Sequence, residues 1–194
     1  MKKIGILGGT FNPPHTGHLI IANEVRHALG LDEVQLMPTA TPSHKATSGE
    51  VTAAQRLRMV ELAVEGVEGL SASSFEVERG GVSYTYDTMK ALTKSEPNTK
   101  FYFIIGGDMI DTLHTWYRIE DLMSLLTFVG VGRPGTEGKT EYPVKIIDIP
   151  ELELSSTLLR KRFREGGSVT LLTPCTVESY IREAGLYGCQ PVDK

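Results

Sequence analysis

The chain has 194 residues, of which 40% are apolar and 23% are charged, and its net charge is −4 at pH 7. These values are typical of one globular domain, which we expect over residues 1–190 with a disordered tail at 191–194. The negative charge gives no reason to expect a nucleic-acid partner, and no apolar run approaches the roughly 20 residues of a membrane span. With no recognisable signal peptide and no disulfide or metal spacing at Cys175 and Cys189, we expect a cytoplasmic protein.

Short apolar runs alternate with amphipathic helical patterns along the whole chain. Loops are expected at 38–51 and 132–143, where Gly, Pro, Ser and Thr gather, and 70–77 has the pattern of an extended segment. In chain order, the remaining predicted elements are a strand at 3–7, a helix at 18–29, a strand at 33–37, helices at 53–64 and 86–94, a strand at 101–105, a helix at 119–125, strands at 127–131 and 144–149, and helices at 156–164 and 174–184.

This alternation predicts a Rossmann-like α/β fold, in which a doubly wound parallel sheet has helices on both faces. Ligands of such sheets bind beyond the carboxyl ends of the strands, where the strand order reverses. Two of the predicted strands are followed directly by glycine pairs, Gly8-Gly9 and Gly106-Gly107. We therefore expect the functional site at that edge of the sheet.

The loop after the first predicted strand has the sequence GGTFNPPHTGH, residues 8–18. Its glycines allow backbone N–H groups to approach a ligand closely. His15 and His18 are three residues apart at a helix start, so both can face one side, and Gly17 leaves space between the imidazoles for a phosphate. The helix N-terminus adds partial positive charge. We expect the backbone and side chains of this loop to cradle a triphosphate, and the residues concerned are Gly8, Gly9, Thr10, Phe11, Asn12, His15 and His18.

This loop resembles the HxGH signature of the nucleotidyltransferase superfamily. Residues 154–160, LSSTLLR, resemble the superfamily's second motif, ISSTxxR. Ser156 is expected to cap a helix whose N–H groups point at phosphate. Arg160 lies one turn further along, on the same face as Ser156 and Thr157.

Three further segments resemble the nicotinate-nucleotide adenylyltransferases: PSHK at 42–45, SYT at 83–85, and GGDM at 106–109 followed by TWYR at 115–118. Ser43 and Gly107 depart from the family's usual residues. The resemblance implies transfer of AMP from ATP to nicotinate mononucleotide, which gives deamido-NAD and pyrophosphate. The start of a helix at 83–85 would bind the nicotinate carboxylate through its N–H groups.

The resemblance also assigns roles to individual residues. His15, His18, Arg160 and Lys45 would act on the phosphates. ATP would contact the first loop together with Gly106, Asp108, Ser156 and Thr157. Nicotinate mononucleotide would contact His44, Lys45, Ser83, Tyr84, Thr85 and Trp116. Mg²⁺ is expected with ATP, held mostly by phosphates and water, so no protein metal site is predicted.

Several alternatives remain open at this point. Trp116 is either a platform for the pyridinium ring or a core anchor, and Asp108 either binds a ribose or caps a helix. Another adenylyltransferase, such as the phosphopantetheine enzyme, and a nucleotide sensor without turnover are the competing functions, and a homodimer is open. Glu76 and Glu78 are expected on the solvent face of a strand. The segment GKT at 138–140 is not a P-loop, because Arg133 replaces the first required glycine.

Overall fold

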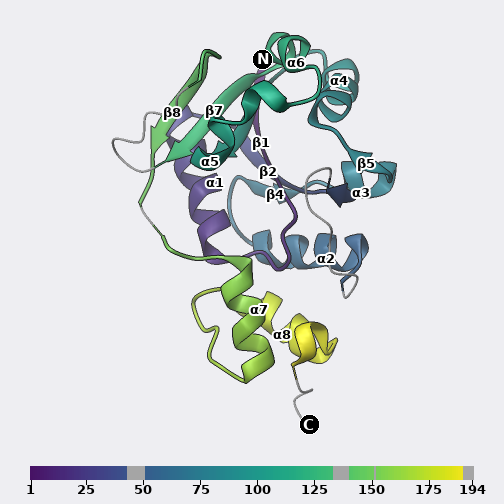
Figure 1. The fold of residues 1–194 in the computed structure, drawn as a ribbon, viewed down its shortest axis with the longest axis vertical. Helices are drawn as coiled ribbons and strands as arrows, with labels where there is room; N and C mark the ends of the chain where they lie inside the picture. The colour runs from purple at the N-terminus through teal and green to yellow at the C-terminus, as the bar shows by residue number, and fades with distance from the viewer. Residues whose placement is uncertain (43–50, 133–139, 151, 190–194) are drawn as a thin grey trace.

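The computed structural model describes residues 1–42, 51–132, 140–150 and 152–189. Within these residues, six parallel strands form the main sheet in the order β4-β2-β1-β6-β7-β8 (Figure 1). The order reverses between β1 and β6, which confirms the predicted doubly wound fold and places its switch point there. The strands are β1 (Lys2–Gly9), β2 (Glu33–Pro38), β4 (Leu70–Ala72), β6 (Thr99–Gly106), β7 (Thr127–Gly132) and β8 (Val144–Asp148).

Helices cover both faces of the sheet, and a separate helical layer lies beneath it (Figure 1). The short strands β3 (Thr41–Pro42) and β5 (Val82–Ser83) pair with each other in parallel. The helical elements are α1 (Thr16–Leu29), α2 (Ala53–Val64), α3 (Phe75–Arg79), α4 (Thr85–Ser95), α5 (Gly107–Ile110), η1 (Leu113–Thr115), α6 (Ile119–Leu125), α7 (Ser156–Glu165), α8 (Cys175–Glu183) and η2 (Leu186–Gly188).

The central strand β6 shows why the sheet is buried on both sides. Phe101, Phe103 and Ile105 pack in one apolar cluster with side chains of α4 and α6. Tyr102 and Ile104, which alternate with them, pack in a second cluster with side chains of α1 and α2. Alternate residues of a strand point to opposite faces, so a continuous apolar run requires cover on both. A third cluster joins α2 to α7 and α8.

The prediction of an extended segment at 70–77 holds for the first three residues, which form β4, and is wrong for the rest. The strand ends at Ala72, and α3 begins at Phe75 and ends where Gly80 adopts a φ of 68°. Glu76 is consequently not on a solvent face, because it is only 8% exposed and accepts a 2.7 Å hydrogen bond from Thr88 Oγ1. A helix of five residues is too short to show a 3.6-residue period, and burial of its side chains against α4 decides its conformation.

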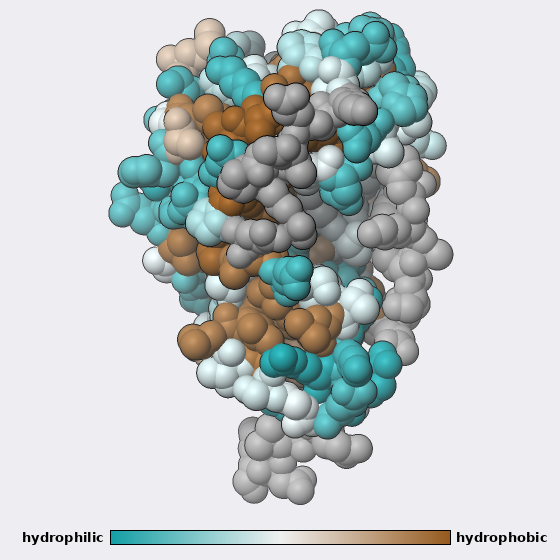
Figure 2. All heavy atoms as spheres, turned by 60° about the vertical axis from the view of Figure 1, so that its left-hand side comes forward, coloured by the Kyte–Doolittle hydropathy of each residue, from teal (hydrophilic) through white to brown (hydrophobic). Residues whose placement is uncertain are grey.

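Some apolar side chains remain exposed on the surface of the protein. Apolar patches are visible on the side that carries β8 (Figure 2), and Ile146 of β8 is 45% exposed. No helix among the described residues is long and apolar enough to cross a membrane. The segments 43–50, 133–139 and 190–194 lie outside the described residues, so the predicted loop residues His44 and Lys45 and the predicted tail are not placed.

Candidate active site

The carboxyl ends of β1 and β6 meet at the switch point of the sheet. These strands pair in parallel, with Leu7 opposite Ile104, so Gly8-Gly9 and Gly106-Gly107 follow at the same edge, as the sequence predicted. The space there is tight, because a Cβ on Gly8 would lie 3.1 Å from the ring of Phe103. The glycines therefore let the backbone line this edge without side chains of their own.

The two histidines of the first loop lie at the N-terminus of α1. His15 is the N-cap residue, and its backbone N–H donates a 3.1 Å hydrogen bond to Nδ1 of His18. The rings face the same side, as predicted, but they stack with centroids 3.7 Å apart and an interplanar angle of 21°. The structure therefore contradicts the prediction that a phosphate fits between the two imidazoles, because stacked rings leave no space there. The contact between the rings of Phe11 and His18 and the hydrogen bond to Nδ1 hold the rings together.

Burial and hydrogen bonding together determine the protonation states of His15 and His18. Burial lowers the pKa of His15 to about 4 and that of His18 to about 3, and the charge of His15 lowers the pKa of His18 further. Both imidazoles are therefore neutral at pH 7. Because Nδ1 of His18 accepts a hydrogen bond, its proton resides on Nε2, which makes this ring a neutral N–H donor.

We expect these histidines to make stability depend on pH. Their ordinary pKa is 6.5, so below that pH the unfolded chain binds protons that the folded protein excludes. Their contribution is therefore complete above pH 6.5 and is lost as the pH falls toward about 4. The expected loss from pH 7 to pH 5 is on the order of 2 kcal/mol per histidine, measured by urea unfolding. The double substitution His15→Gln and His18→Gln should flatten this slope, whereas His27→Gln at the exposed end of α1 should not; equal slopes in all three proteins would contradict the assignment.

The carbonyl oxygens of the first loop are held from outside by side chains distant in sequence. Thr173 precedes α8, whose N-cap residue is Pro174, and its side chain bonds the first loop. The loop therefore has its conformation fixed by the surrounding elements rather than by its own sequence. The bonds run from Arg56 Nη1 to Thr10 O at 2.9 Å, from Arg160 Nη1 to Asn12 O at 2.8 Å, from Ser156 Oγ to Pro13 O at 2.8 Å and from Thr173 Oγ1 to Pro14 O at 2.9 Å.

The second motif lies directly beside the first loop, but with different individual roles. The N-cap of α7 is Ser155, whose Oγ accepts from Leu158 N at 3.3 Å, so the prediction that Ser156 caps the helix is wrong. By sequence alone, the hydroxyl of either Ser155 or Ser156 could cap α7. Ser156 instead donates its hydroxyl to Pro13 O, and Ser155 caps the helix. Arg160 and Thr157 share a face as predicted, with Nη2 donating to Thr157 Oγ1 at 3.1 Å. The motif thus brings a guanidinium to the first loop.

The SYT segment opens α4, as the sequence predicted. Tyr84 is the N-cap residue and Thr85 begins the helix. Ser83 Oγ accepts a 3.1 Å hydrogen bond from the backbone N–H of Ala40, and β5 pairs with β3. This segment is therefore hydrogen-bonded to the loop that follows β2. Lys45 comes a few residues later in the sequence, outside the described residues.

Trp116 and Asp108 lie close to the end of β6. Trp116 packs edge-on against Phe103 and Phe128, with centroids 6.0 and 5.8 Å away, so it anchors the core cluster at this edge. Asp108 does not cap α5, because Gly106 is the N-cap residue and no side chain caps that helix. The carboxylate instead leans over Gly106, where an added Cβ would lie 2.7 Å from Oδ1.

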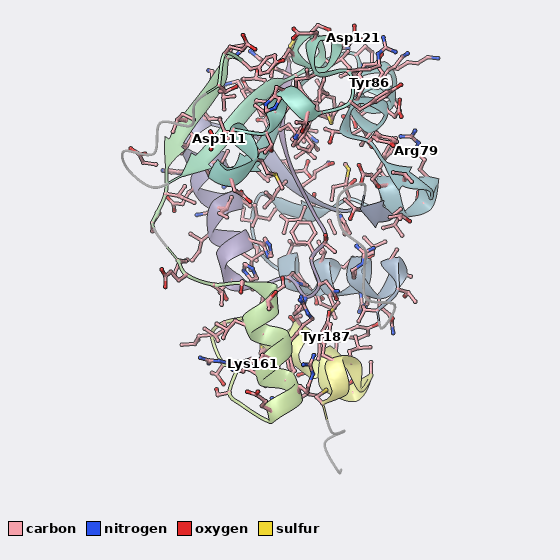
Figure 3. The ribbon with its side chains drawn as sticks, viewed as in Figure 1. Arg79, Tyr86, Asp111, Asp121, Lys161 and Tyr187 are labelled. Carbon is pink, nitrogen blue, oxygen red and sulfur yellow. The ribbon has the colours of Figure 1, made fainter. Side chains whose placement is uncertain are left out.

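Two residues that sequence reasoning missed are built into the site. Arg56 is 1% exposed and binds the loop from α2, and Tyr187 donates a 2.6 Å hydrogen bond to Asn12 Oδ1. Tyr187 lies where α7 and α8 meet the rest of the molecule (Figure 3). For Arg56 a signal existed, because a charged residue occupies the apolar face of α2 four positions before Val60. Tyr187 had no comparable signal.

The described residues offer few side chains that could ligate a metal ion together. Among them, no three His, Cys, Asp or Glu side chains are placed to hold one ion together. Asp108 is the acidic side chain that accompanies the glycine pair after β6. This donor set fits an ion that brings its own phosphate ligands.

Comparison with known proteins agrees with this geometry. The cytidylyltransferase-like family model matches residues 6–162. A Bacillus cytotoxicus protein named "Probable nicotinate-nucleotide adenylyltransferase" is 54% identical over 187 residues, which is 96% of this chain and 99% of the relative, and a Bacillus anthracis protein of the same name is 52% identical over the same shares.

A solved structure shares the fold. The Plasmodium falciparum nicotinic acid mononucleotide adenylyltransferase complexed with NaAD superposes with a TM-score of 0.78 at 21% identity, covering 98% of this chain and 99% of that one. The family model spans most of this chain, and the identity to the Bacillus relatives extends over nearly all of it. The chain therefore belongs to the cytidylyltransferase-like family and, within it, to the nicotinate-nucleotide adenylyltransferases.

Proposed function

We infer that the protein transfers AMP from ATP to nicotinate mononucleotide, giving nicotinate adenine dinucleotide and pyrophosphate in NAD biosynthesis. The observation that carries this inference is the neutral histidine pair at the N-terminus of α1, beside the glycine pair at the switch point. The Bacillus relatives with the corresponding name support it over nearly the full length of the chain. Because this reaction consumes ATP, we place it in the cytoplasm.

The attacking group is the 5′-phosphate of nicotinate mononucleotide. Its second pKa is about 6, so it is largely a dianion at neutral pH and needs no general base. One of its oxygens forms a bond to the α-phosphorus of ATP, and the bond from that phosphorus to the bridging oxygen of the β-phosphate breaks in line. Pyrophosphate leaves with that electron pair. The protein therefore has to position both reactants and stabilise negative charge.

We assign this stabilisation to groups at the first loop. Neutral His18 donates from Nε2, and His15 lies against it, at the helix end where the partial positive charge of the helix dipole attracts anions. Gly8, Gly9 and Thr10 line the same edge. Arg160 uses two N–H groups to hold Asn12 O and Thr157 Oγ1, and we assign its remaining donors to the leaving pyrophosphate. Mg²⁺ bound to ATP would neutralise phosphate charge, with water and phosphate as its main ligands.

The nicotinate half of the site is assigned to the start of α4. The backbone N–H groups there suit a carboxylate, whereas a carboxamide would present its own NH₂ to the same donors. Trp116 lies at the same edge of the sheet and is proposed to contact the pyridinium ring from its packed position. His44 and Lys45 are proposed to bind the substrate phosphate.

Pyrophosphate release from Mg-ATP tests the reaction and its specificity together. We expect kcat/KM for nicotinate mononucleotide to exceed that for nicotinamide mononucleotide by roughly 10- to 150-fold, the value of one charge-assisted hydrogen bond. Equal rates would keep the chemistry and contradict the assignment of α4. Release with neither substrate, but with phosphopantetheine, would contradict the proposed function.

A further inference from the structure

Arg56 is a buried cation that contacts two loops at once. Nη1 donates to Thr10 O of the first loop at 2.9 Å. Nη2 donates to Thr39 O at 2.6 Å and to Ala40 O at 2.9 Å, in the loop that follows β2. The residue is 1% exposed and projects from the middle of the first half of α2. One planar guanidinium therefore sets the distance between two segments that come from adjacent strands.

Burial of this charge is costly, and the hydrogen bonds described for it go to neutral carbonyl groups. Burial lowers the pKa of Arg56, and the neighbouring Tyr187 opposes that change. Its Nε is also buried without a hydrogen-bond partner among the described residues. An apolar residue at this position of an amphipathic helix would avoid the desolvation cost. What the guanidinium supplies, and an apolar residue could not, is the simultaneous hydrogen bonding of carbonyl groups from two loops.

The contacts of Arg56 continue to the segment assigned to nicotinate. Ala40, whose carbonyl binds Arg56, donates its own N–H to Ser83 Oγ at the start of α4. Thr39 donates its N–H to Gly9 O, so the same loop also touches the phosphate side directly. An unbroken chain of hydrogen bonds thus runs from Thr10 through Arg56 and Ala40 to Ser83.

We propose that Arg56 is a positioning residue that couples the two substrate subsites, so that ATP and nicotinate mononucleotide each strengthen the binding of the other. The inference rests on the proposed function, which places ATP at the first loop and nicotinate mononucleotide at the start of α4. A ligand that displaces Thr10 moves the guanidinium, and the guanidinium passes this displacement to the carbonyl groups of Thr39 and Ala40. Such coupling has to be reciprocal, which makes it measurable from either side.

The test is calorimetric titration of the full chain with the α,β-methylene analogue of ATP and Mg²⁺, with and without saturating nicotinate mononucleotide, and the reverse titration. For the wild type we expect each ligand to lower the Kd of the other about fivefold or more. Arg56→Met should reduce this factor to below about twofold. Arg56→Lys should also reduce it, because one ammonium group cannot span carbonyls of both loops. Arg58→Met is the matched control, since Arg58 lies on the same helix, is exposed and pairs with Glu61.

The outcomes separate this inference from the proposed function. A wild type that releases pyrophosphate but shows no coupling, or an Arg56→Met protein with undiminished coupling, overturns the role of Arg56 alone. If Arg56→Met does not fold, as judged by circular dichroism, undiminished coupling in Arg56→Lys overturns it equally. A wild type that binds neither ligand overturns the proposed function, and this inference with it. Loss of coupling in both Arg56 variants, with the Arg58→Met control unchanged, supports the proposal.

Discussion

Substitution of His18 by alanine is expected to lower kcat by about 10²- to 10³-fold, with a smaller change in the KM for ATP. His18 presents a neutral Nε2–H donor because its Nδ1 is occupied by the backbone N–H of His15. This donor is fixed before the substrate arrives, by the stacked ring of His15 and the edge of Phe11. A group held in advance toward developing phosphate charge stabilises the transition state more than the ground state. Alanine removes the donor and the ring that supports His15.

Two companion variants make this result interpretable. His18→Gln keeps an amide donor near the position of Nε2 and should recover part of the lost rate. His27→Ala removes an exposed histidine from the last turn of the same helix and should leave kcat unchanged. Single-turnover measurements with saturating substrates separate the chemical step from product release. A loss of only a few-fold in His18→Ala would contradict the assignment.

Substitution of Phe128 by alanine is expected to reduce the free energy of unfolding by about 3–5 kcal/mol, which is a large part of the roughly 5–15 kcal/mol of a typical domain. Phe128 is fully buried in β7 and contacts the rings of Phe103 and Trp116 edge-on. Its removal leaves a cavity between two rigid rings that cannot easily collapse into it. Urea unfolding at pH 7.5 measures the effect.

The same variant has a second, functional readout. Trp116 would lose one of its two aromatic supports, so the KM for nicotinate mononucleotide should rise more than the KM for ATP. Leu152→Ala, at a residue that is 48% exposed, should change stability by less than about 0.5 kcal/mol. If Phe128→Ala matched that control, the packing account of this edge would be wrong.

The sheet could be predicted because its strands carry their own signal. The apolar run of β6 followed by Gly106-Gly107 identifies a strand buried on both faces, and its end marks the ligand edge. The parallel, doubly wound arrangement followed from the alternation of strands with helices, whereas the order of the strands came from the structure. Short elements carry no comparable pattern of apolar residues, as α3 shows. There, packing of Phe75 and burial of Glu76 determine the conformation more than the local sequence does.

The sequence motifs identified candidate site residues, but they did not show how those residues contact one another. The motifs located the histidines and Arg160, which lie at the first loop, and the start of α4, where Ser83 is hydrogen-bonded to the loop after β2. Sequence spacing could not show that the imidazoles stack, because that depends on surrounding side chains. It also could not choose Ser155 over Ser156 as the cap, since the choice is made by Pro13, more than a hundred positions earlier. The roles assigned to individual residues in substrate binding stay predictions.

The order in which the first loop acquires its partners has a consequence for synthesis of the protein. The loop leaves the ribosome well before three of its partners, because Ser156, Thr173 and Tyr187 follow their loop partners by 143, 159 and 175 residues. At elongation rates of about 5–20 residues per second, the loop waits roughly 10–35 s for the last of them. A nascent chain can pair its first strands during this interval while the nucleotide site is still incomplete. Nucleotide binding should thus emerge abruptly once Tyr187 has been synthesised, and chains terminated before Ser156 should compete for neither substrate.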